Sequence, residues 1–257
     1  MNERMNIRRM QVPESEERTF RFDPDRELTT TDWDNIRELV IRNHDTGAWD
    51  EFAKNYEALC VMGHQNDYEI FEPDWEGIEN RRYSLERLGN TAGAIRLASL
   101  MKGIDPARVR PFTESQWKMA LETAEQLRAG ARESWGNYSY ISLVHDLNQI
   151  NPGRAVIDSY VWAVIEKRYA EIREVRDRLL LTSLSATVLD MDPSKVPEIS
   201  TSEWEEIRRD LAKVIKKEVW SRAITLARDM TVIVRHEAKR AKKRSGEASP
   251  VPQSVEL

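Results

Sequence analysis

The chain reads LTTTDW at residues 28–33, FTESQW at 112–117 and ISTSEW at 199–204, so one short pattern occurs three times. In each copy a Thr or Ser stands four residues before the Trp, and Asp, Gln or Glu stands directly before it. This is the spacing of a capping box, in which each of the two side chains accepts a hydrogen bond from the other residue's backbone amide. The apolar residue before the hydroxyl and the Trp five places later form a hydrophobic staple. The pattern therefore predicts three helix starts, with N-caps at Thr29, Thr113 and Ser200.

Two further tryptophans extend the pattern to five repeats. The five are spaced by 42, 42, 45 and 42 residues, and each is followed three places later by Ile or Ala. They are Trp33, Trp75, Trp117, Trp162 and Trp204. An apolar residue, then Asp, Glu or Asn, then Pro precedes every one, as Phe22-Asp23-Pro24, Phe71-Glu72-Pro73, Ile104-Asp105-Pro106, Ile150-Asn151-Pro152 and Met191-Asp192-Pro193. Because proline cannot continue a helix, each triplet is predicted to close one unit and begin the next.

Each unit has room for two helices. Trp49, Trp135 and Trp220 open the second helix of the first, third and fifth units, and Gly89-Asn90 divides the second unit. In the fourth unit we expect residues 155–189 to form one long helix, either straight or bent. No segment shows the alternation of a strand, so the class is all-α.

The predicted fold is an α-solenoid-like stack of about five helical hairpins, with a period of ~42 residues. In its period and its hairpins the chain resembles HEAT and armadillo repeats, which span ~40 to 47 residues. A compact helical bundle is the alternative. We expect three segments: an N-terminal arm at 1–21, a helical-repeat domain at 22–234, and a basic helix end with a disordered tail at 235–257.

Composition sets the expected environment. Among 257 residues, 40% are hydrophobic and 32% charged, which favours an ordered globular chain. No apolar run approaches the ~20 residues that a membrane-spanning helix needs. The single cysteine, Cys60, excludes an internal disulfide framework, which fits a reducing compartment. We therefore expect a cytoplasmic protein without membrane contact.

Catalytic signatures are missing from the sequence. The four histidines show no metal-ligand spacing, and neither a Gly-rich phosphate loop nor a nucleophile motif occurs. We expect no enzyme activity, no cofactor and no metal. His145 is the exception to watch, because it lies ten places after Trp135, where the matching helices carry Leu59 and Met230. A hydrogen-bonded, half-buried histidine is the favoured interpretation over a catalytic one.

Two other groups invite functional readings. The acidic residues around Trp75, namely Asp74, Glu76 and Glu79, are interpreted as surface residues that complement a helix dipole. The repeated tryptophans could stack on a ligand. A residue that recurs in every unit is needed by every unit, however, so core packing is favoured for them. Function is expected at positions that vary between repeats.

The C-terminal stretch RHEAKRAKKR, residues 235–244, is strongly basic. It carries a net charge of +5 in a chain whose total is −5, so the remainder sums to −10. The candidate contact residues for nucleic acid or an acidic partner are Arg235, Lys239, Arg240, Lys242, Lys243 and Arg244. A helix end with favourable charge is the structural alternative.

Two functional hypotheses follow. The first is a non-catalytic adaptor or scaffold with a protein partner, based on the repeats and the missing catalytic motifs. The second is a nucleic-acid-associated accessory protein that contacts phosphates through residues 235–244.

Overall fold

The computed structural model describes residues 22–130, 134–154 and 157–244. The predicted N-terminal arm, 1–21, and residues 245–257 of the predicted tail lie outside this part of the chain. Within it, all regular structure is helical, which confirms the all-α class.

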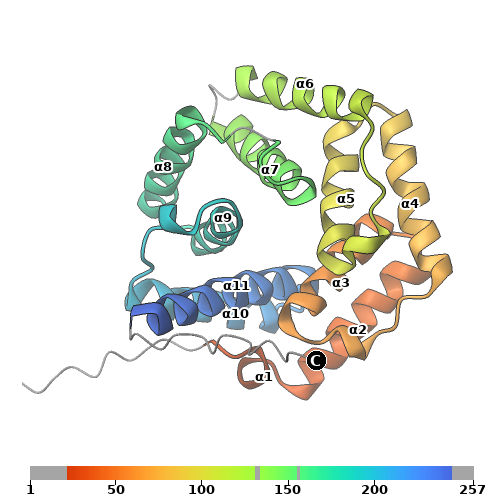
Figure 1. Cartoon of the computed structure of the whole chain (residues 1–257). Coiled ribbons are helices and arrows are strands. Elements are labelled where there is room, and N and C mark those ends of the chain that lie inside the picture. Colours follow the sequence, from red (N-terminus) through yellow and green to blue (C-terminus); the bar gives the residue numbers. More distant parts are fainter. Residues whose placement is uncertain (1–21, 131–133, 155–156, 245–257) are drawn as a thin grey trace, which may run out of the picture.

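In the described part of the chain, ten long helices pair in chain order into five hairpins (Figure 1). The pairs are α2 (Thr30–Asp45) with α3 (Trp49–Met62), α4 (Glu72–Arg87) with α5 (Thr91–Ile104), α6 (Glu114–Gly130) with α7 (Ser134–Ile150), α8 (Ser159–Glu174) with α9 (Arg178–Met191), and α10 (Thr201–Lys216) with α11 (Trp220–Arg244). A short helix, α1 (Pro24–Glu27), precedes them, and single 3₁₀ turns lie between some hairpins: η1 (Gln65–Asp67), η2 (Pro106–Arg108) and η3 (Pro193–Lys195).

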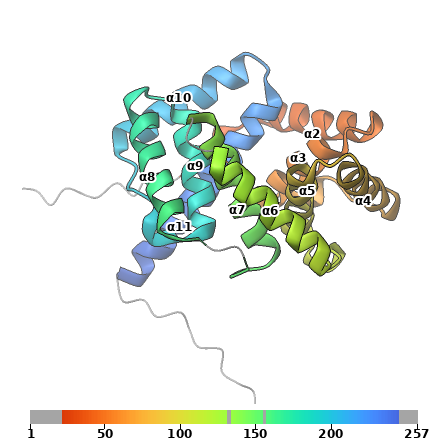
Figure 2. The same ribbon diagram turned by 90° about the horizontal axis from the view of Figure 1, so that it is seen from above.

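The hairpins follow one another around a closed ring. The second helix of each pair, α3, α5, α7, α9 and α11, lies toward the middle, and the first helix lies outside it (Figures 1 and 2). Each inner helix packs on the next, and α11 packs on both α9 and α3. The last hairpin therefore rests on the first, a contact that the repeat pattern alone did not predict.

The three predicted helix starts are confirmed. The backbone amides of Thr29, Thr113 and Ser200 each donate to the side chain three residues later, at 2.8 Å, 2.9 Å and 2.9 Å. The reciprocal bonds to the three hydroxyls are 3.2 to 3.3 Å long. In α4 the carboxylate of Asp74 accepts from the amide of Phe71 in the same way, at 2.8 Å. These bonds satisfy amides that a helix start would otherwise leave without a partner.

The same capping residues also tie each hairpin to the one before it. Four hydrogen bonds join side chains 30 residues apart, from the end of one outer helix to the start of the next. They link His44 to Asp74 (2.8 Å), Glu86 to Gln116 (3.1 Å), Arg128 to Asp158 (3.1 Å) and Arg173 to Glu203 (3.2 Å). A capping residue thus serves both its own helix and the junction between repeats, which explains why the pattern recurs.

The repeated tryptophans are structural, as predicted. Trp33, Trp75, Trp117 and Trp204 are buried, and Trp162 is partly buried. A side chain from the connection that follows the hairpin covers four of their rings. Arg108 lies over Trp75 at 5.6 Å, Arg154 over Trp117 at 4.9 Å and Lys195 over Trp162 at 5.8 Å, while the ring of His64 stacks on Trp33 at 3.8 Å. Cations over indole faces are attractive, so these contacts strengthen the repeat junctions.

The single long helix predicted for residues 155–189 is wrong. The chain forms two helices there, because α8 ends at Glu174 and α9 begins at Arg178. Arg176 takes a left-handed backbone conformation with φ of 56°, and Asp177 caps α9 by accepting from the amide of Leu180 at 3.0 Å. A left-handed backbone is uncommon for arginine, and helix ends of this kind usually carry glycine. Because neither glycine nor proline stands here, the break could not be read from the sequence.

The proline triplets are also not all equivalent. Asp23, Asp105 and Asp192 cap α1, η2 and η3, short elements that precede the next outer helix. Glu72 and Pro73 instead form the first turn of α4 itself, since proline fits the first positions of a helix.

Candidate functional site

The inner helices enclose a cavity of about 310 Å³ in the middle of the ring. Four of them contribute residues spaced at i, i+3, i+4 and i+7, and α9 contributes residues at i, i+4 and i+7, spacings that place side chains on one helix face. The lining consists of Lys54, Glu57, Ala58 and Val61 of α3; Arg96, Ser99, Leu100 and Gly103 of α5; Ser142, His145, Asp146 and Gln149 of α7; Ser183, Thr187 and Asp190 of α9; and Thr225, Arg228, Asp229 and Val232 of α11.

These lining positions vary from hairpin to hairpin. The first position on each face carries Lys, Arg, Ser, Ser and Thr in chain order, and the i+7 position carries Val, Gly, Gln, Asp and Val. The repeated tryptophans, in contrast, occupy the same position in every hairpin. The cavity is therefore where the repeats differ most visibly in chemistry.

A buried charge cluster lies on one side of the cavity. The guanidinium of Arg228 on α11 donates to Glu57 on α3, at 3.0 Å and 3.3 Å, and to Asp229 at 3.1 Å. Burial opposes the charge on Arg228, but Glu57 and Asp229 hold its pKa above the usual value. Burial raises the pKa of Asp229, although Arg228 works against that rise. This cluster spans the contact between the last hairpin and the first.

A second cluster is centred on His145. Its Nε2 lies 3.2 Å from Asp190 of α9, and its Nδ1 lies 3.3 Å from the neighbouring Asp146. Burial would lower the pKa of His145, but the hydrogen bonds and charges of the two carboxylates outweigh it and raise the pKa to about 9. His145 is thus a hydrogen-bonded, partly buried histidine, as interpreted from the sequence.

The expected repeat phase of His145 needs correction. Alignment on Trp135 placed it opposite the apolar core residues Leu59 and Met230. In the structure, His145 occupies the i+3 position of the cavity face, the place that Glu57 and Arg228 take in their helices. The cavity face begins at Ser142, seven residues after Trp135, but at Lys54 and Thr225 it begins five residues after the corresponding Trp, so alignment on the tryptophans is out of phase by two residues.

The acidic group at the start of α4 is not a simple surface feature. Asp74 is buried and bonds both to the amide of Phe71 and to His44. Glu79 pairs with Arg82 at 3.0 Å. Asp74 joins α4 to α2, whereas the Glu79–Arg82 pair lies within α4, so the surface interpretation of Asp74 is wrong.

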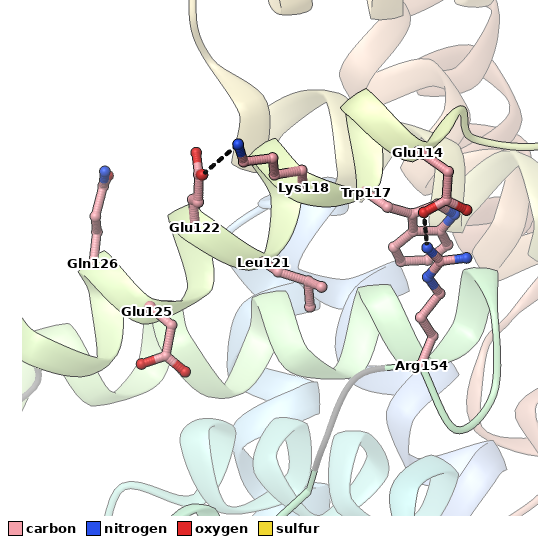
Figure 3. Close-up of a pocket in the computed structure, with 8 residues that line it drawn as sticks. All are labelled: Glu114, Trp117, Lys118, Leu121, Glu122, Glu125, Gln126 and Arg154. Carbon is pink, nitrogen blue, oxygen red and sulfur yellow. Dashed lines mark hydrogen bonds and ion pairs between the residues drawn. The ribbon is translucent and has the colours of Figure 1, made fainter.

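The outer helix α6 carries an open surface pocket of about 600 Å³ (Figure 3). Leu121 lies at its centre and is 37% exposed. Met119 is 47% exposed but lies on a different face of α6, where it borders another pocket. Charged groups of both signs border the pocket: Glu114 with Arg154, and Lys118 with Glu122 at 3.9 Å. Trp117 forms the floor but is buried.

The basic segment continues α11 rather than forming a separate element. Arg235 donates to the carbonyl of Val61, near the end of α3, and Arg240 donates to the carbonyl of Pro193. Lys239 is exposed. Lys242, Lys243 and Arg244 belong to the last turns of α11, but their side chains lie outside the described residues. Two of the six candidate residues thus hold the ring together, whatever else they contact.

The described residues contain no group of three or more His, Cys, Asp or Glu side chains placed to hold a metal ion. No helix in this same part of the chain is long and apolar enough to cross a membrane.

The sequence missed the charged cavity lining. Glu57, Arg228 and Asp229 lie beside the apolar stripes of their helices, where charged residues are ordinary, so the sequence pattern did not single them out. The ring closure that brings α3 and α11 together was needed to recognise them as neighbours. Comparisons with protein-family models, with curated proteins and with solved structures found no match.

Proposed function

We propose that this protein is a non-catalytic helical-repeat adaptor or scaffold, an α-solenoid whose stack of hairpins displays a docking surface for another protein. The observation that carries the proposal is the exposed apolar side chain of Leu121 on α6, in an open pocket with a charged border. Protein interfaces have this arrangement, with an apolar centre and a polar rim. The partner we expect presents apolar side chains surrounded by charges of both signs. A cytoplasmic location is part of the same proposal, supported by the single cysteine.

The test is affinity capture from the native cell with matched variants. Leu121→Glu places a charge in the centre of the proposed surface, while Ile41→Glu makes the same change at a 45% exposed site on α2. Neither change touches the core, so both variants should fold. We expect a protein captured by the wild type to survive nuclease treatment, to be lost with Leu121→Glu and to be kept with Ile41→Glu. Equal capture by both variants would refute the α6 surface.

A second candidate is the nucleic-acid accessory role. It is favoured by the unbroken helix through Arg244, which places Arg235, Lys239 and Lys242 at i, i+4 and i+7 along one side of α11. Deleting residues after Val234 should then weaken duplex DNA binding and reduce its salt dependence by ~0.9 per lost phosphate contact. A full-length protein that binds no nucleic acid at ~50 mM salt, where such contacts are strong, would remove this candidate.

A further inference from the structure

The fold does not require a carboxylate at every place where the cavity lining has one. At the positions that Asp146, Asp190 and Asp229 take in their helices, other hairpins carry Ala58, Leu100, Val61 and Val232, so apolar side chains fit there. Replacing a buried ion pair by packed apolar residues is often neutral or stabilising. Charges kept in the middle of a ring that accommodates apolar residues therefore point to a role beyond folding.

Part of the lining is satisfied within the protein. The Glu57–Arg228 pair joins α3 to α11, and the His145–Asp190 pair joins α7 to α9. These pairs help to close the ring. They do not use all of the hydrogen-bonding capacity that faces the cavity.

Both a hydrogen-bond donor and several hydrogen-bond acceptors in the lining remain without a partner among the residues that the structure describes. Arg96 lines the cavity, is exposed, and makes no hydrogen bond or ion pair within the described residues. Asp146, Asp190 and Asp229 each engage one carboxylate oxygen in a side-chain bond, which leaves the second oxygen of each as an acceptor. The cavity thus offers one planar cationic donor and several anionic acceptors.

The charges of the lining also balance. Lys54, Arg96, Arg228 and a protonated His145 face Glu57, Asp146, Asp190 and Asp229. A simple anion or a simple cation would disturb this balance. A molecule with one group of each sign would not, because each group meets its complement.

We propose that the central cavity binds a small zwitterionic molecule of the amino-acid type, with its carboxylate on Arg96 and its ammonium group on the free oxygens of Asp190 and Asp229. A guanidinium binds a carboxylate through two parallel hydrogen bonds, which suits Arg96 to the anionic end. The volume of about 310 Å³ is at the small end of ligand pockets, which favours a molecule of this size. Arg96 and Asp190 are both exposed, so the ligand can enter beside them. This proposal does not depend on the adaptor function.

The experiment uses the full chain and the standard amino acids, tested singly by thermal shift and then by titration calorimetry. A ligand that binds only the folded state raises Tm with concentration. We expect at least one amino acid to do so saturably. Its decarboxylated amine and its deaminated acid, each lacking one charge, should bind at least tenfold more weakly.

Arg96→Met tests the site without endangering the fold, because Arg96 is exposed and makes no hydrogen bond or ion pair within the described residues. It should leave the Tm of the unliganded protein unchanged and weaken binding at least tenfold. Arg87→Met, at an exposed arginine on α4, is the matched control and should bind like the wild type. Asp229→Asn should weaken binding of the same amino acid.

Three results would overturn the proposal. The first is that no standard amino acid shifts Tm. The second is that Arg96→Met binds as tightly as Arg87→Met. The third is that the decarboxylated amine binds as tightly as its amino acid, which would assign the cavity to cations instead.

Discussion

The outer helix starts and the inner cavity face are built from the same five repeats, yet they follow opposite rules. At the outer helix starts the same solution recurs, a capping side chain that also bonds to the preceding hairpin 30 residues away. On the cavity face no two hairpins present the same set of side chains. Interactions that every junction needs must recur, whereas a site that occurs once in the molecule has no reason to. The comparison separates residues that build the ring from residues that are free to carry a function.

The largest effect is expected at a repeated core position. Trp204 is only 2% exposed, so Trp204→Ala should destabilise the fold by ~3 to 5 kcal/mol, typical of a buried aromatic truncated to alanine. The loss should extend to neighbouring hairpins, which hydrogen exchange can measure. An unchanged Tm accompanied by lost partner binding would instead make Trp204 an interface residue.

The ring closure should be nearly as sensitive. Glu57→Ala leaves the buried Arg228 without its cross-helix partner, so we expect a loss of about 3 kcal/mol in the free energy of unfolding, measured by denaturant titration. The double variant Glu57→Ala/Arg228→Met removes both charges and should recover much of this loss. A single variant as stable as the wild type would show that the pair does not hold α3 to α11.

The His145 cluster should make stability depend on pH. Its pKa is raised from 6.5 to about 9 by Asp146 and Asp190 against the effect of burial, so the protonated form stabilises the fold. This stabilisation is complete below pH 6.5 and is lost as pH rises through 9. We expect a fall of about 2 to 3 kcal/mol across that range. In His145→Gln the fall should be absent, and an equal fall in this variant would assign it to another group.

The helix caps should show the smallest effects. Thr113→Ala and Ser200→Ala should each cost ~0.5 to 2 kcal/mol, because each removes a hydroxyl that accepts from a helix amide. Thr31→Ala is the control, since Thr31 lies inside the first turn of α2 and caps nothing. Thermal denaturation of the three variants gives the comparison. Equal losses at all three sites would contradict the capping role.

The repeat pattern predicted the outer helices well because their signals are local. Capping boxes and staples involve residues within five positions, so Thr29, Thr113 and Ser200 could be placed from the sequence alone. The prediction of one helix over residues 155–189 was wrong because the break at Arg176 has no local sequence signal. The surrounding structure maintains the left-handed backbone of Arg176, and no neighbouring residue type predicts it.

The sequence by itself determined the helical class, four of the five hairpins and the structural role of the tryptophans, since each depends on periodicity and short-range hydrogen bonds. Only the tertiary structure decided that α11 returns to α3, that Glu57 and Arg228 become partners 171 residues apart, and that His145 belongs to the cavity rather than the core. Small rotations between successive hairpins accumulate over five units, and local patterns do not specify their sum. That sum closes the ring and brings the unlike inner faces together around one cavity.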